Sequence, residues 1–71
     1  METYKIRPEE DFIKLGQLLK ACNMVSSGVE AKIEIQNGNV NLNGAVEIQR
    51  GKKLHDGDIV SFNGREIKVI R

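Results

Sequence analysis

The stretch that most constrains the fold lies in the middle of the chain and reads SSGVEAKIEIQNGNVNLNG. Ser27 followed three residues later by Glu30 is a capping box, in which the serine oxygen accepts a backbone N–H and the glutamate reaches back to the cap. A helix should therefore begin here and run to about Gln36. Asn37 and Gly38 would then end it, because both tolerate the left-handed backbone of a helix end.

This predicted helix has two apolar sides. At 100° per residue, Ala31 and Ile35 fall on one side, and Val29 and Ile33 fall on another. Two apolar sides indicate two neighbours, so we expect the helix to be wedged between a second helix and a sheet. Two polar strips remain for solvent, a basic one of Lys32 with Gln36 and an acidic one of Glu30 with Glu34. Only the basic strip could meet a polyanion.

A second helix is predicted just before this one. Apolar residues recur there at the spacing of one buried helical stripe, namely Leu15, Leu18, Leu19 and Cys22. An earlier start would place Gly16 inside the helix at a cost of about 1 kcal/mol relative to alanine, so we expect the helix to begin near Lys14. The connector between the two helices is short, and the helices should pack together.

The remaining segments predict strands. Alternating residues indicate short strands at 3–6, 40–42 and 45–48, and Asn43-Gly44 should turn the chain between the last two. The segments 59–62 and 67–70 flank Asn63-Gly64, a strong signal for a hairpin. Between the strands at 45–48 and 59–62 we expect the polar loop QRGKKLHDGD, residues 49–58. The sequence thus predicts one α+β domain over residues 1–71, with two packed helices against a small, mainly antiparallel sheet of about four to five short strands.

Length and composition exclude several classes of protein. A chain of 71 residues can bury only a modest core, which leaves no room for a deep active site. Cys22 is the only cysteine and His55 the only histidine, so neither an internal disulfide nor a usual zinc ligand set can form. We expect no cofactor, and we expect Cys22 to be a core thiol. No apolar run approaches the roughly 20 residues of a membrane span, which predicts a soluble, cytoplasmic protein.

The positive charge is small in total but uneven along the chain. The formal net charge is +1, which argues against a strongly basic, nonspecific binder of nucleic acid. However, Lys14 and Lys20 have no acidic residue between them, and the segment QRGKKLH holds Arg50, Lys52 and Lys53 without an anion. This distribution predicts a local basic patch.

These residues together resemble the S-four RNA-binding domain, which occurs in a small-subunit ribosomal protein, bacterial tyrosyl-tRNA synthetases, pseudouridine synthases and a ribosome-rescue heat-shock protein. The family pattern is matched by Ser27, Ala31, Ile35, Gly38, Val40, Leu42, Asn43, Gly44, Leu54, Gly57, Asp58, Ile59 and Val60. The resemblance spans residues 15–60. One position departs from the pattern, since the arginine that commonly follows the serine is Gly28, as is usual in the short stand-alone bacterial branch that this chain resembles.

The resemblance implies that the helix pair and the loop after the central strands face RNA. A reader of folded RNA needs several cations on one surface and backbone donors where a phosphate comes close. The free N–H groups of a helix start and a residue without a side chain suit such a contact at Ser27 and Gly28. The candidate RNA-binding residues are Lys14, Lys20, Ser27, Gly28, Lys32, Asn43, Gly44, Arg50, Lys52 and Lys53.

Each candidate also has a plain structural interpretation. Ser27 caps a helix whatever else it does, and Asn43 and Gly44 serve the turn. The cations of the loop could simply keep it solvated. Asp56 and Asp58 are expected to bind backbone donors in the HDGD turn rather than to act as a catalytic pair. Aromatic residues are few, and no two are spaced along one strand, so recognition by shape and phosphate is favoured over base stacking.

The leading hypothesis is a non-enzymatic, monomeric protein that binds structured RNA, either ribosomal or transfer RNA. The alternative is an adaptor that contacts ribosomal proteins or other nucleic-acid-handling proteins, which the low net charge would suit. An enzyme has little support, because no nucleophile lies beside a plausible base and no metal-binding set is present.

Overall fold

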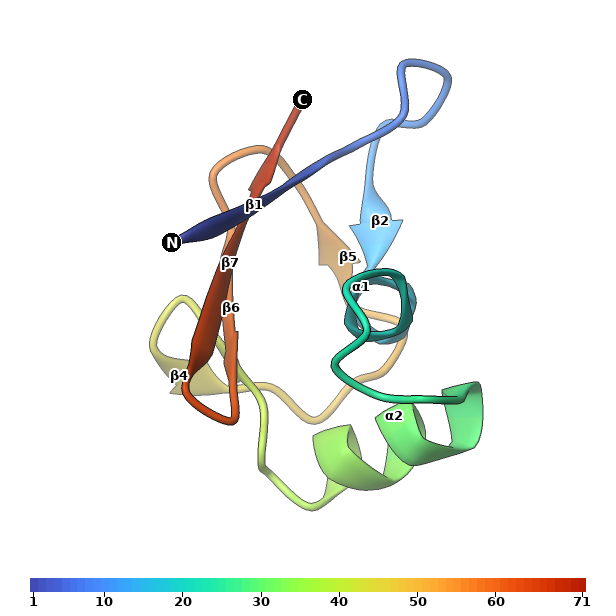
Figure 1. Cartoon of the computed structure of the whole chain (residues 1–71), viewed down its shortest axis with the longest axis vertical. Helices are drawn as coiled ribbons and strands as arrows, with labels where there is room; N and C mark the ends of the chain where they lie inside the picture. Colours follow the sequence, from blue (N-terminus) through green and yellow to red (C-terminus); the bar gives the residue numbers. More distant parts are fainter.

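The computed structural model describes residues 1–71 and shows two helices beside a sheet (Figure 1). The helices are α1, Leu15–Ala21, and α2, Gly28–Gln36. The strands, in chain order, are β1 Glu2–Lys5, β2 Ile13–Lys14, β3 Asn41–Leu42, β4 Ala45–Val46, β5 Lys53–Leu54, β6 Ile59–Phe62 and β7 Arg65–Ile70. The expected α+β class, with two packed helices and a small sheet, is confirmed.

Five of the strands form one mixed sheet in the order β1-β7-β6-β3-β4. Most neighbours in it are antiparallel, as expected. However, β1 runs parallel to β7, with Glu2 opposite Ile67 and Lys5 opposite Ile70. This strand occupies residues 2–5 rather than the predicted 3–6, and the strands predicted at 40–42 and 45–48 are shorter than expected.

The turns of the sheet follow the sequence signals. Asn63 and Gly64 have φ angles of 51° and 79° and close the β6–β7 hairpin, as predicted. The left-handed residue after α2 is Gly38, with φ of 81°. Asn37, in contrast, stays right-handed at φ of −79°, so Gly38 alone supplies the left-handed end of the helix.

The hydrophobic core lies between the helices and the five-stranded sheet. The fully buried side chains are Leu15, Leu18, Leu19, Ala31, Ile35, Val40, Leu54, Val60, Ile67 and Val69. Both helices bury one stripe each and therefore pack together over this core, as the spacing of their apolar residues predicted. Cys22 is only partly buried at the edge of the core, where burial raises the pKa of its thiol, so the expectation of a core thiol was only partly right.

The second apolar side predicted for α2 has no neighbour. Ala31 and Ile35 are fully buried, whereas Val29 and Ile33 are 69% and 52% exposed. The prediction that α2 is wedged between two neighbours was therefore wrong. The helix lies at the edge of the molecule and covers the core with one side only (Figure 1).

The predicted polar loop of residues 49–58 contains a short strand. Within it, β5 pairs with β2 in a separate two-stranded sheet, with Ile13 opposite Leu54 and Lys14 opposite Lys53. Ile13 and Leu54 are buried, and this burial fixes the ladder against the core. The loop is consequently anchored beside the start of α1 (Figure 1).

Candidate nucleic-acid interface

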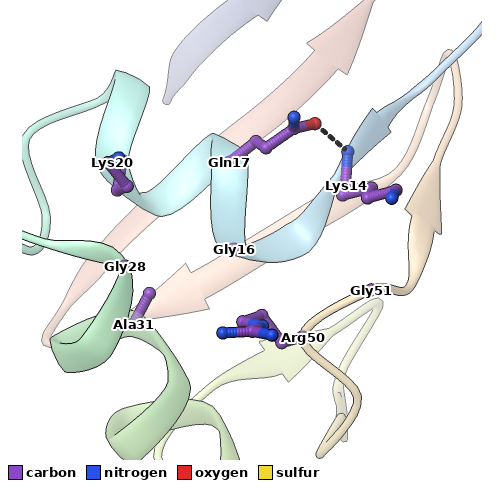
Figure 2. Close-up of a pocket in the computed structure, with 8 residues that line it drawn as sticks. All are labelled: Lys14, Gly16, Gln17, Lys20, Gly28, Ala31, Arg50 and Gly51. Carbon is purple, nitrogen blue, oxygen red and sulfur yellow. Dashed lines mark hydrogen bonds between the residues drawn. The ribbon is translucent and has the colours of Figure 1, made fainter.

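A groove of about 270 Å³ runs between the two helices and the loop that follows β4 (Figure 2). Three parts of the chain line it: α1 with the residue before it, the first half of α2 and the loop between β4 and β5. The lining residues are Lys14, Gly16, Gln17, Lys20, Gly28, Ala31, Arg50 and Gly51. The fold thus brings together four of the residues proposed from sequence, namely Lys14, Lys20, Gly28 and Arg50.

The groove is positively charged and contains no carboxylate among its lining residues. Its three cations, Lys14, Lys20 and Arg50, are exposed. The two ion pairs of the structure lie elsewhere and join Arg65 to Glu2 and Arg71 to Asp11. The positive charge of the groove is therefore not neutralised from within the protein.

Arg50 is placed by a close contact with α1. The backbone carbonyls of Arg50 and Lys52 accept hydrogen bonds from Gly16 and Leu15 at 3.0 and 2.9 Å, so the loop satisfies two free donors at the start of the helix. A Cβ atom on Gly16 would lie 2.7 Å from Cγ of Arg50. Only a glycine leaves room for the arginine stem here, and in Figure 2 the Arg50 side chain points from its loop toward α2.

The start of α2 is capped as the sequence predicted, with one difference. Ser27 Oγ accepts the N–H of Glu30 at 3.1 Å. The Glu30 carboxylate, however, accepts the N–H and the hydroxyl of Ser26, both at 2.7 Å, and not the N–H of Ser27. These hydrogen bonds lower the pKa of Glu30. The serine half of the capping box is therefore as predicted, whereas the glutamate binds the residue before the cap instead of the cap itself.

The backbone of α2 leaves open space at its first residue. No atom lies within 4 Å of where a Cβ on Gly28 would be. The N–H groups of Gly28 and Val29 have no acceptor within the helix, because the first turn of a helix leaves its donors free. The next two donors, Glu30 and Ala31, bind the side chain and the carbonyl of Ser27. A phosphate could approach the backbone here as the sequence suggested, next to the cations of the groove.

The other proposed residues lie outside the groove lining. Lys32 is exposed on α2, one turn after Gly28, and Lys52 is exposed in the loop. Both polar groups of the Asn43 side chain are used within the protein. Its Nδ2 donates to Asp58 at 3.0 Å, and its Oδ1 accepts the N–H of Ile59 at 2.9 Å. Asn43 and Gly44 have φ angles of 52° and 85°, which fits the turn that the sequence predicted.

Lys53 belongs to a surface that sequence reasoning missed. On the β2–β5 ladder it lies opposite Lys14, and its Nζ sits 4.9 Å from the centre of the Phe12 ring. The Phe12 ring is in turn 6.3 Å from that of His55. The signal was present as alternation, since Phe12 and Lys14 flank the buried Ile13, and Lys53 and His55 flank the buried Leu54.

The potential metal ligands of the chain do not cluster in the structure. No group of three or more His, Cys, Asp or Glu side chains could hold a metal ion. Asp56 and Asp58 bind the backbone N–H groups of Arg71 and His55 at 3.0 and 2.8 Å, as expected for turn residues. None of the helices is long and apolar enough to cross a membrane.

Comparison with known proteins agrees with this geometry. A family model described as S4 domain, the S-four domain of the sequence resemblance, matches residues 5–70. YbcJ of Escherichia coli (strain K12) is 40% identical over 58 residues, which cover 82% of this chain and 83% of that protein. A protein of Bacillus subtilis (strain 168), named "Probable ribosome maturation protein RlbA", is 36% identical over 79% of each chain.

A solved structure extends the match to the whole fold. The solution structure of E. coli YbcJ, reported to reveal an ALFAL motif involved in RNA-binding, superimposes with a TM-score of 0.72 at 35% identity. The match covers 100% of this chain and 89% of that one. On the evidence of its sequence and its fold, this chain is a member of the S4 domain family.

Proposed function

We propose that this protein binds structured RNA without catalysing a reaction, and that the groove between α1, α2 and the loop before β5 holds the phosphate backbone. The observation that carries the proposal is the meeting of Lys14, Lys20 and Arg50 on one groove with no carboxylate in its lining. RNA presents closely spaced phosphates, and a surface with several unpaired cations suits them.

The energetics of the β2–β5 ladder support the same function. Lys14 and Lys53 are directly opposite each other, and like charges in that position destabilise a pair of strands. No carboxylate relieves them by an ion pair. A polyanion bound across this surface would remove the repulsion, so the arrangement favours a phosphate-rich ligand.

The names of the relatives support one class of RNA over the other. E. coli YbcJ is described as having a motif involved in RNA-binding, and the B. subtilis relative is named for ribosome maturation. We therefore favour ribosomal RNA over transfer RNA as the ligand. If about four to six phosphates are neutralised, the logarithm of the affinity should fall with the logarithm of salt concentration with a slope of about −3 to −5.

Charge reversal tests the proposal directly. Replacing Lys14, Lys20 and Arg50 together with glutamate should abolish binding to ribosomal RNA fragments in an anisotropy titration. The matched control reverses Lys5, Arg7 and Lys68, three exposed cations outside the groove lining, and changes the net charge equally. Equal affinity losses in the two variants, or none in the first, would show that the groove is not the RNA site.

One observation favours the alternative of a protein adaptor. Val29 and Ile33 expose a second apolar side of α2 that packs on nothing in this chain. Affinity capture from a lysate with and without ribonuclease separates the two functions. Ribosomal proteins that remain bound after digestion, and that are lost when Val29 and Ile33 are replaced with serine, would favour the adaptor.

A further inference from the structure

The outer face of the β2–β5 ladder carries two aromatic rings and two cations. Ile13 and Leu54 point into the core, and successive side chains of a strand point to opposite faces. Phe12 and Lys14 therefore share the outer face of β2, and Lys53 and His55 share that of β5. Continuing the observed register places Phe12 opposite His55, in agreement with the 6.3 Å between their ring centres.

The two rings are open to a ligand. Phe12 is half-buried, His55 is exposed, and their planes meet at 52°. The ammonium of Lys53 lies over the Phe12 ring, 4.9 Å from its centre, at the end of an exposed side chain. A flat ligand can displace this ammonium without disturbing the core, because the Lys53 side chain is exposed and neither Lys53 nor Phe12 belongs to the core cluster.

The charges around the rings favour a nucleotide over a neutral aromatic ligand. Lys14 and Lys53 flank the rings on the same face. The neighbouring carboxylates are engaged elsewhere, since Asp11 lies 3.7 Å from the Arg71 guanidinium and Asp56 accepts the N–H of Arg71. A nucleotide offers both a planar base and a phosphate, which these two kinds of side chain recognise together.

We propose that Phe12 and His55 form a stacking subsite for one unpaired base of the RNA, adjoining the groove through Lys14. The base replaces the Lys53 ammonium on the Phe12 ring, and Lys53 is then free to bind a phosphate. This inference rests on the proposed function and deepens it. It assigns the ligand to structured RNA that carries an unstacked nucleotide next to a helical segment, since a base inside a continuous duplex cannot reach a protein ring.

Two RNA hairpins with the same stem test the subsite. One is fully paired, and the other carries a single bulged 2-aminopurine in the stem. Stacking of one base is worth about 1–3 kcal/mol, so the wild-type protein should bind the bulged hairpin about 5 to 150 times more tightly in an anisotropy titration. Phe12→Leu should bind both hairpins with the affinity that the wild type has for the paired one, and His55→Ala should lose part of the preference.

A second variant covers the case in which Phe12→Leu does not fold. The chain contains no tryptophan, so Phe12→Trp introduces a single tryptophan, at the subsite, whose emission can be excited selectively. Its fluorescence should be quenched by the bulged hairpin and much less by the paired one.

The outcomes distinguish this inference from the proposed function. The stacking subsite would be overturned if the wild type bound both hairpins with equal, salt-dependent affinity, or if tryptophan fluorescence stayed unchanged at saturation. Either result would still agree with RNA binding in the groove. Failure of the wild type to bind either hairpin would overturn both.

Discussion

At the scale of single residues, the contact between Gly16 and Arg50 decides the shape of the groove. A Cβ at position 16 would meet the arginine stem at 2.7 Å, and the Arg50 carbonyl caps the N–H of the same glycine at 3.0 Å. The glycine therefore both receives the loop and leaves space for the side chain that the loop carries. In the proposed RNA site, Gly16 would act only by positioning Arg50.

Gly16→Ala should separate stability from binding. Alanine is favoured over glycine within a helix by about 0.5–1 kcal/mol, and pushing the Arg50 stem aside offsets this gain, so the melting temperature should change little. The displaced Arg50 should weaken RNA binding about three- to tenfold, part of the roughly 1.5–3 kcal/mol that a hydrogen bond to a charged group contributes. Anisotropy titration measures the loss. In an Arg50→Ala background the same change should have no further effect, and an additive effect would contradict the contact.

The cap of α2 should make the stability of the protein depend on acid pH. Hydrogen bonds from Ser26 hold the pKa of Glu30 below its ordinary value of 4.5. As the pH falls, the unfolded chain binds a proton first, so the contribution of Glu30 is present above about pH 4.5 and is lost as the pH falls through the lower folded-state pKa.

Thermal melts from pH 7 to pH 3 should show this loss, because the melting temperatures of the wild type and of Glu30→Gln should converge as the pH falls. The melting temperature of Glu30→Gln should lie below that of the wild type at pH 7 and approach it below pH 4.5. Glu66→Gln is the matched control, because the Glu66 side chain makes no hydrogen bond or ion pair in the structure. A gap between Glu30→Gln and wild type that stays constant with pH would argue against the Ser26–Glu30 cap.

At the scale of elements, α2 shows how amphipathic spacing can mislead. Its residues at 29 and 33 are as apolar and as regularly spaced as those at 31 and 35, so periodicity alone gave both sides equal weight. Only the position of the helix at the edge of the molecule separates them. The free energy that α2 contributes to folding should therefore come from the side of Ala31 and Ile35.

Ile33→Ala and Ile35→Ala form a matched pair that measures this difference. Both make the same change in the same helix. Ile35 is fully buried, so its truncation should lower the free energy of unfolding by about 2–5 kcal/mol. Ile33 is 52% exposed, and its truncation should change that free energy by less than about 0.5 kcal/mol. Urea denaturation measures both values, and similar losses would mean that the outer side of α2 is covered.

At the scale of the whole molecule, signals between neighbouring residues predict local structure, whereas the pairing of distant segments is not predicted by them. The Ser27 cap, the Asn63-Gly64 turn and both helices depend on neighbouring residues, and the sequence was sufficient for them. The pairing of β2 with β5 joins two-residue strands, and the brief alternation around Ile13 and Leu54 does not identify the two segments as partners. The rings of Phe12 and His55 meet across these two strands, so the spacing of aromatic residues along a single strand does not predict their pairing.

The candidate site was predicted in part. Family resemblance and charge spacing indicated Lys14, Lys20, Gly28 and Arg50, which the fold gathers around one groove. Gly16, Gln17 and Gly51 line the same groove without a charge or a motif to mark them. Their role depends on how close two backbones come, which is a property of the packed fold.

The parallel pairing of β1 with β7 sets a constraint on synthesis. Residues 2–5 are made well before residues 67–70, which are their hydrogen-bonding partners. At about 5–20 residues per second the first strand waits roughly 3–13 s for its neighbour. The sheet can be completed only after translation has passed through both helices and the hairpin, so a nascent chain that stalls before β7 leaves its opening strand without a partner.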